Sequence, residues 1–482
     1  MNKQDVIEWI EANRSQFIDL AQEIWENPEV SFKEFKSSNF QAQFLEKLGW
    51  KITWDLGGLN TAFMAEWGEG KPVLGFIGEF DALPGLSQKL SPDPEPIEGL
   101  DAGHGCGHNL LGVGCLAAAV AFREWLEKSG NKATVRYYGC PAEEDGNGKV
   151  VIGSAGYFKD LDAAFNYHPG SMNKPAKGSS LAVNDLHLRF HGVSSHAGGS
   201  PHLGRSALDA IELTHVGINY LREHVTSNIR MHYIITHGGQ APNIVPDFAE
   251  DWLYLRAPNR KELNEVTDRV IKIAEGAAMM TDTGLEVDMK SGSTNILNNH
   301  YLADMHYDNL EVIGPIEYTE EELAFAARIN SHFPKENVDN FYKRLGAPEG
   351  KEAELEALKG QPVIGLNFPA NDENKIGGGS TDVGDLSWMV PLTMMSTTCN
   401  STGAPGHSWA VTATSGMSIG HKGMLHAAKA MALTAIDIIE DPAHLQKIRG
   451  EFEKRTAEMP YTFPTPDQIK KPDYFNPVRN TK

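Results

Sequence analysis

The sequence contains little cysteine, with four residues in a chain of 482. Four cysteines in so long a chain are too few for the disulfide framework that small secreted domains use. The first residues, 1–11, have neither a basic start nor an apolar run, so they do not resemble a signal peptide. We therefore expect a reduced, cytoplasmic protein.

The chain also lacks an excess of positive charge. Acidic residues outnumber basic ones by 64 to 43, which gives a formal net charge of −21. Binding to nucleic acids or anionic membranes needs cationic side chains that face phosphates. No run reaches the apolar length of about 18 residues that a bilayer span needs. We therefore expect no nucleic-acid partner and no membrane partner.

One short loop does carry metal-ligand chemistry. Its sequence is His-Gly-Cys-Gly-His at 104–108, and an apolar, alanine-rich run follows at 110–125. Glycine weakens both helices and strands, so the segment is predicted to be a tight loop before a buried helix. A thiolate at Cys106 and an imidazole at His108 are both ligands that zinc prefers.

Three predicted strands lead to further residues of ligand type. They are 71–78, which leads to Glu79 and Asp81; 133–140, which leads to Glu143 and Glu144; and 162–168, which ends at His168. The carboxyl ends of neighbouring parallel strands lie at one edge of a sheet, where α/β proteins place their functional groups. These side chains are therefore expected to converge.

The order of the elements predicts the fold class. Strands alternating with helices indicate a mainly parallel, doubly wound α/β domain. From about residue 181 the order becomes strand, helix, two strands, helix and strand, which predicts an inserted α+β domain with an antiparallel sheet. The predicted division is 1–182 and 296–482 for the catalytic domain and 183–295 for the insert.

Two histidines compete for the last ligand position. His407 follows a Gly/Pro-rich loop, and His421 begins a predicted helix and ranks lower. The complete candidate set is Cys106, His108, Glu144, His168 and His407. Five ligands exceed the four of a tetrahedral zinc site and suit two metal ions with a shared ligand. The neighbouring carboxylate of Glu143 can then act as general base.

Several motifs together resemble one family. They are Asp-Ala-Leu-Pro at 81–84, His-Gly-Cys-Gly-His at 104–108, Pro-Ala-Glu-Glu at 141–144, His-Pro at 168–169, Gly-Val-Ser-Ser-His at 192–196 and Gly-Gln-Ala-Pro-Asn at 239–243. The sequence resembles the M20 metallopeptidases, and within them the Cys-containing amidohydrolase branch. The resemblance implies a phosphorylase/hydrolase-like catalytic domain and an inserted lid that carries the dimer contact.

The resemblance also implies residue roles. Cys106 would bridge two divalent ions, zinc or manganese; His108 and His168 would complete one site, and Glu144 and His407 the other. Glu143 would be the general base. His196 would reach the partner's cleft and polarise the scissile carbonyl, Asn243 would steady the oxyanion, and Asp81 would orient a ligand histidine. Two positions depart from the family pattern. Glu79 stands where other branches have a histidine, and we assign the role of that histidine to His108. Asn109 stands where relatives often have aspartate.

The expected activity is hydrolysis of the amide bond in an N-acyl or aroyl amino acid of the p-aminobenzoyl-glutamate type. Arg205 and Arg256 are candidates for gripping the carboxylate of this small-molecule substrate. A homodimer through the lid is expected, or a pair with a paralogous subunit. The alternatives are a dipeptidase or carboxypeptidase on the same scaffold, and a partner subunit without catalytic activity.

Overall fold

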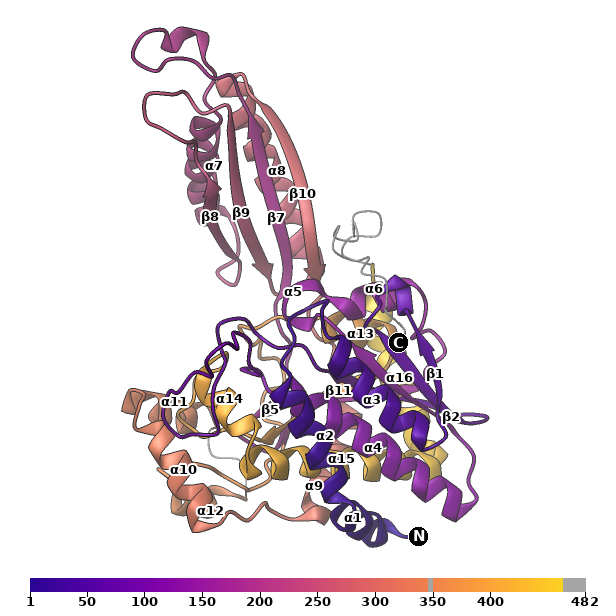
Figure 1. Ribbon diagram of the computed structural model, residues 1–482. Coiled ribbons are helices and arrows are strands. Elements are labelled where there is room, and N and C mark those ends of the chain that lie inside the picture. Colours follow the sequence, from indigo (N-terminus) through magenta and orange to yellow (C-terminus); the bar gives the residue numbers. More distant parts are fainter. Residues whose placement is uncertain (346–349, 463–482) are drawn as a thin grey trace.

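A computed structural model describes residues 1–345 and 350–462. Figure 1 shows a broad α/β body from which a long arm projects, made of four strands and two helices. The arm is formed by the middle of the sequence, so both flanking segments contribute to the body.

The body is built on a seven-stranded sheet in the order β1-β2-β4-β3-β5-β11-β6. The strands are β1 (Lys51–Trp54), β2 (Phe63–Gly68), β3 (Val73–Glu79), β4 (Thr134–Cys140), β5 (Ala163–Gly170), β6 (Lys174–Pro175) and β11 (Leu392–Thr398). The central strands β4, β3, β5 and β11 run parallel, and the pairs at both edges are antiparallel. The predicted mainly parallel α/β sheet is confirmed.

Helices cover both faces of this sheet (Figure 1). The principal helices of the body are α1 (Lys3–Ala12), α2 (Arg14–Glu26), α3 (Phe35–Lys47), α4 (His108–Ser129), α6 (Gly148–Ser154), α9 (His300–Ile313), α13 (Val383–Met389), α15 (Ser418–Glu440) and α16 (Pro442–Glu458). Shorter or peripheral ones are α5 (Glu143–Gly146), α10 (Glu320–Asn330), α11 (Lys335–Leu345), α12 (Glu352–Ala357) and α14 (Trp409–Ser415). The largest hydrophobic core joins α4 and α15 to the sheet.

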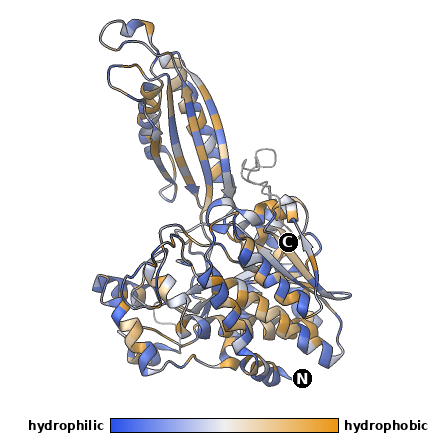
Figure 2. Cartoon of the chain, viewed as in Figure 1, coloured by the Kyte–Doolittle hydropathy of each residue, from blue (hydrophilic) through white to orange (hydrophobic). Residues whose placement is uncertain are grey.

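Helix α4 is apolar along most of its length, as the hydropathy colours of Figure 2 show. By length and composition it is the one described helix that could cross a membrane, so the expectation of no such run is wrong on that measure. However, 89% of its most apolar window is buried inside the protein. This burial is typical of a core helix, because a spanning helix exposes apolar side chains to lipid.

The arm, which we call the lid, contains a four-stranded antiparallel sheet in the order β10-β7-β9-β8. Its elements are β7 (Ala182–His191), α7 (Ala207–Leu221), β8 (Arg230–His237), β9 (Phe248–Ala257), α8 (Arg260–Thr281) and β10 (Gly284–Ser293), in the predicted order. Buried and half-buried residues alternate along β9, because only one face of the sheet packs against α7 and α8. Figure 2 shows the matching bands of both colours along the lid strands.

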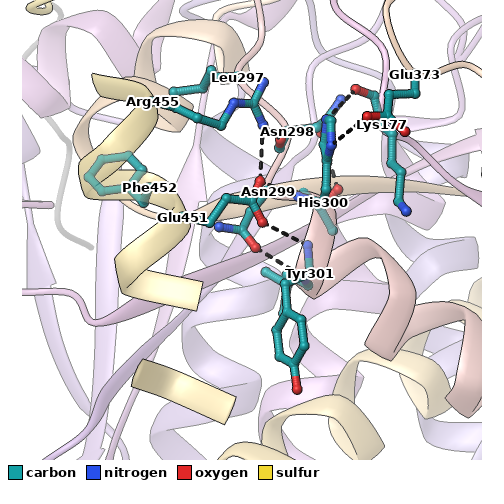
Figure 3. A network of polar contacts seen from close by, with 12 residues as sticks. Lys177, Leu297, Asn298, Asn299, His300, Tyr301, Glu373, Glu451, Phe452 and Arg455 are labelled. Atoms are coloured by element: carbon teal, nitrogen blue, oxygen red, sulfur yellow. Dashed lines mark hydrogen bonds and ion pairs between the residues drawn. The ribbon is translucent and has the colours of Figure 1, made fainter. Parts of the chain in front are cut away.

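The C-terminal helix α16 is fastened to the start of α9 by polar contacts (Figure 3). The Glu451 carboxylate accepts the backbone N–H groups of His300 at 2.7 Å and Tyr301 at 2.9 Å. Arg455 donates to the carbonyl of Asn298 and pairs with Glu451. An acidic side chain at a helix N-terminus satisfies N–H groups that have no partner within the helix.

Candidate active site

The predicted ligands meet at the carboxyl edge of the central strands. β3 ends at Glu79, β4 leads into α5 with Glu143 and Glu144, and β5 carries His168. The loop with Cys106 lies directly before α4, whose first residue is His108. Since β4, β3 and β5 are neighbours in one parallel sheet, their ends bring these side chains together.

The sulfur of Cys106 is common to two groups of possible ligands. The first contains Cys106, His108 and His168, and the second contains Cys106, Glu144 and His407. In each group, one ligand atom from every residue lies within 4.8 Å of the others. The backbone N–H of His407, a residue in the left-handed conformation, donates to the Gly105 carbonyl at 3.1 Å. This bond ties the two distant loops together.

Hydrogen bonds fix the directions of two histidine rings. The Nδ1 atom of His108 lies 2.9 Å from Asp81 Oδ1, and Nδ1 of His168 lies 2.9 Å from the Pro169 carbonyl oxygen. A ring that donates from Nδ1 presents Nε2 as a lone pair, which is the form that binds a metal. In both residues Nε2 therefore faces the neighbourhood of Cys106, and His168 Nε2 lies 3.3 Å from the sulfur.

The unsatisfied atoms of this cluster fit a pair of divalent cations. His108 Nε2 and Glu144 Oε1 are buried and form no hydrogen bond with any described residue. Burial raises the pKa of the Cys106 thiol to about 12, so the thiolate needs nearby cations. Sulfur, imidazole nitrogen and carboxylate oxygen together suit zinc or a similar first-row ion.

Glu143 lies beside this cluster as a separate carboxylate. Its oxygen lies within 4.8 Å of ligand atoms of Glu79 and His108. Burial, with smaller contributions from the charges of Glu79 and Asp382, raises the pKa of the Glu143 carboxyl well above its ordinary value. A carboxyl group with a raised pKa is a stronger proton acceptor than an ordinary one, which suits a general base.

A buried lysine, which sequence reasoning missed, stands behind the cluster. The Lys149 ammonium lies 2.7 Å from Glu79 Oε1 and 2.6 Å from Asp382 Oδ1, and all three side chains are buried. Its only signal in the sequence is a charge among the small and apolar residues 148–153. Lys149 thus neutralises Glu79, whose other oxygen lies 3.4 Å from His108 Nε2. Asn109, the other departure from the family pattern, donates instead to the carbonyls of Ala21 and Ser415.

A cavity of about 720 Å³ opens beside the cluster, between the body and the lid. Its lining includes Glu143, Glu144 and His407 on one side and Arg256 on the other. Arg256 donates to Ser380 Oγ at 2.9 Å and forms no ion pair with a described residue. Arg205 does not line the cavity, because its guanidinium pairs with Asp282 at 2.7 Å elsewhere on the lid.

Three other predicted residues lie apart from the cluster. His196 and Asn243 belong to the loops 192–206 and 238–247, at the end of the lid farthest from the body (Figure 1). These loops are joined to each other, since the Ala197 N–H donates to the Asn243 carbonyl at 3.0 Å. His421, the lower-ranked alternative, lies in α15 and belongs to no ligand group among the described residues.

Comparison with known proteins identifies the family of this chain. Residues 183–279 match the peptidase dimerisation domain of the M20 family. The chain is 40% identical over 464 residues to one of the subunits of p-aminobenzoyl-glutamate hydrolase from Escherichia coli K12, covering 95% of this chain and 96% of that one. It is 31% identical over 454 residues to a mouse Xaa-Arg dipeptidase, covering 91% and 89%.

Solved structures show the same fold. A dinuclear metal binding peptidase of the M20 family from Bacillus subtilis aligns with a TM-score of 0.59 at 17% identity, covering 89% of this chain and 99% of that one. An aminobenzoyl-glutamate utilization protein from Klebsiella pneumoniae aligns with a TM-score of 0.58 at 16% identity, covering 91% and 98%. The chain therefore belongs to the M20 metallopeptidase family, in its Cys-containing amidohydrolase branch, and is a hydrolase that acts on amide bonds.

Proposed function

We propose that the protein hydrolyses the amide bond of N-acyl or aroyl amino acids of the p-aminobenzoyl-glutamate type. The observation that carries this proposal is the sulfur of Cys106, which belongs to two ligand groups, with the Glu143 carboxyl beside them, within 4.8 Å of ligand atoms of Glu79 and His108. The relative of 40% identity supports the choice of substrate class. The cavity is large enough for such a molecule, because small-molecule sites occupy about 300–1,000 Å³.

Each residue of the cluster has a proposed role. His108 and His168 would hold one divalent ion, Glu144 and His407 the other, and Cys106 would bind both; zinc and manganese both fit these ligands. Bound there, the ions would polarise the scissile carbonyl and lower the pKa of the attacking water. Asp81 orients His108 through its Nδ1 atom. Glu143 takes a proton from the attacking water and returns it to the nitrogen of the leaving amine.

The free carboxylate of the substrate would bind to Arg256. The guanidinium is half-buried, its charge is not matched by a described carboxylate, and it lines the same cavity as Glu143. A carboxylate binds most strongly to a charged donor that is already desolvated and held in place. Arg256 is held in this way by its hydrogen bond to Ser380. Arg256 therefore sets the distance between the anionic end of the substrate and the scissile bond.

We propose that residues 183–295 form a separate lid and dimerisation unit inserted between 1–182 and 296–482. Support comes from the hydrophobic core that the lid has of its own. The loops 192–206 and 238–247, which carry His196 and Asn243, lie at the end of the lid farthest from the body, so these two residues would act in the cleft of a second subunit, either an identical chain or a paralogue. The four unpaired cysteines support a cytoplasmic location.

A dipeptidase activity is the second candidate. The acidic side chains of Asp145 and Asp185 line the cavity, and they would suit a cationic residue of a dipeptide. The mouse relative of 31% identity is named for Xaa-Arg substrates. The deciding experiment compares release of glutamate from p-aminobenzoyl-glutamate with release of arginine from dipeptides, using the metal-loaded protein. If the protein hydrolyses neither class of substrate, the proposed activity is disproved.

A further inference from the structure

The turn between α2 and α3, residues 27–34, contributes none of the proposed ligands, yet it contacts the segment that carries Glu143. The side chain of Glu34 is fully buried. Its Oε1 atom accepts the backbone N–H groups of Ala142 and Phe32, each at 2.9 Å, and its Oε2 atom accepts the hydroxyl of Thr61 at 3.0 Å. The carboxylate of Glu34 therefore joins this turn to the end of β4.

Ala142 has a backbone conformation that its side chain does not favour. It is left-handed, with φ 58° and ψ 44°, and it directly precedes Glu143. A residue with a Cβ atom keeps such a conformation only where its surroundings enforce it. The Ala142 carbonyl accepts the N–H groups of Gly146 at 3.1 Å and Gly148 at 3.4 Å, both of which follow it in the chain. The bond to Glu34 is the restraint on Ala142 that comes from the turn 27–34.

The same turn also contacts the other parts of α5. The Ser31 hydroxyl donates to Asp81 Oδ2 at 2.9 Å, and that oxygen also accepts the N–H of Glu144 at 2.9 Å. The ring of Phe32 packs against Gly146 so closely that an added Cβ there would lie 1.9 Å from Phe32 Cζ. Contacts from residues 31–34 thus restrain the start and the end of α5 directly, and its middle by way of Asp81.

We propose that Glu34 is a positioning residue for amide hydrolysis: it holds the Ala142 N–H and thereby fixes the direction in which the Glu143 side chain leaves the backbone. This inference rests on the proposed role of Glu143 as general base. Glu34 is not one of the proposed metal ligands, so its effect reaches the reaction through the backbone that it holds, at Ala142 and at Phe32. A small change in the direction of Glu143 matters, because a misplacement of about 1 Å in a catalytic group can cost about 100-fold in rate.

Three variants separate positioning from a general loss of stability. Glu34→Ala removes the acceptor, whereas Glu34→Gln keeps an oxygen for Ala142, and the Thr61 hydroxyl can turn to accept from the new amide. Glu29→Ala is the matched control, because the Glu29 carboxylate accepts Lys36 N and Ser37 N and so caps α3 in the same turn. We expect Glu34→Ala to lower kcat by about 10- to 100-fold with KM within about twofold and two metal ions still bound. Glu34→Gln should recover most of kcat, and Glu29→Ala should keep it while its melting temperature falls.

Hydrogen exchange of the metal-free protein gives a readout that does not depend on activity. Glu34→Ala should speed deuterium uptake in the peptide that covers residues 141–146, and Glu29→Ala should not. The inference is wrong if Glu34→Ala keeps the wild-type kcat or leaves this exchange unchanged, or if Glu34→Gln loses fold and metal together with Glu34→Ala. If the wild-type protein hydrolyses no amide, the proposed function fails, and the exchange comparison still decides whether Glu34 holds Ala142.

Discussion

The Nε2 atom of His168 lies 3.3 Å from the Sγ atom of Cys106, although 62 residues separate them in the chain. The same sulfur is within 4.8 Å of ligand atoms of Glu144 and His407. One thiolate within reach of two sets of ligands would suit a pair of divalent ions, with Cys106 contributing to both.

Replacing Cys106 should therefore remove metal rather than only slow turnover. We expect Cys106→Ser to bind fewer than two ions per chain and to lose nearly all activity, because a serine hydroxyl is a much poorer bridging ligand than a thiolate. Cys115→Ala is the control, since Cys115 is buried within α4. Elemental analysis of the purified variants measures the number of metal ions per chain. Two ions per chain in Cys106→Ser would contradict the proposal that Cys106 binds both ions.

Replacing Glu143 should slow turnover without removing metal, unlike the replacement of Cys106. Glu143→Gln is expected to keep both metal ions and the fold but to lower kcat by about 10²- to 10⁴-fold, because an amide cannot accept the proton of the attacking water. Steady-state kinetics and metal analysis on one preparation test this prediction. Unchanged kcat in this variant would assign the base to another group.

Arg256 should act on substrate binding. Losing a hydrogen-bonded charge pair costs about 1.5–3 kcal/mol, so Arg256→Met should raise KM by about 10- to 150-fold for substrates with a free carboxylate. An analogue with that carboxylate amidated should show little difference between variant and wild type. Arg205→Met, which removes an arginine paired with Asp282 outside the cavity, is the matched control and should leave KM unchanged. Equal KM changes in both arginine variants would count against a carboxylate site at Arg256.

The proposed role of His196 in the cleft of a second subunit predicts that two inactive variants can restore activity when they form a mixed dimer. If His196 serves the cleft of a second chain, His196→Ala and Glu143→Gln homodimers should each be nearly inactive. After the two are mixed and allowed to exchange chains, half of the dimers are mixed and each has one intact site, so about a quarter of the wild-type activity should return. Sedimentation analysis confirms the exchange. Failure to recover activity despite exchange would place His196 outside the reaction.

Acid should destabilise the protein through His306, a buried histidine that belongs to no ligand group among the described residues. Burial lowers the pKa of His306 from 6.5 to about 3. Between these values the unfolded chain binds a proton that the folded chain does not, so stability falls as the pH falls from about 6.5, by up to about 1.4 kcal/mol per pH unit for this group. His306→Gln should therefore show a smaller drop in the melting temperature of the metal-free protein between pH 7 and pH 5. An equal drop in variant and wild type would contradict this assignment.

The sequence by itself predicted the sheet and nominated a set of candidate ligands for local physical reasons. Apolar runs that end in acidic or histidine residues indicated β3, β4 and β5, and alternation of apolar residues indicated the lid strands. The short strands β1 and β6 were missed, because two to four residues at a sheet edge carry no clear periodicity. Glycines around Cys106, the ends of two strands and the Gly/Pro-rich loop before His407 nominated the five candidate ligands, which the structure brings into two groups that share Cys106.

Only the tertiary structure showed how these side chains are held. The choice of His407 over His421 depends on a loop that contacts Gly105, a residue far away in the sequence. The pairing of Lys149 with Glu79 and Asp382, and the bond from Glu34 to Ala142, join residues that no local pattern relates. Local sequence determines the type of each element through backbone preference and apolar periodicity, whereas partners for buried charges and N–H groups are decided by which segments the fold places together.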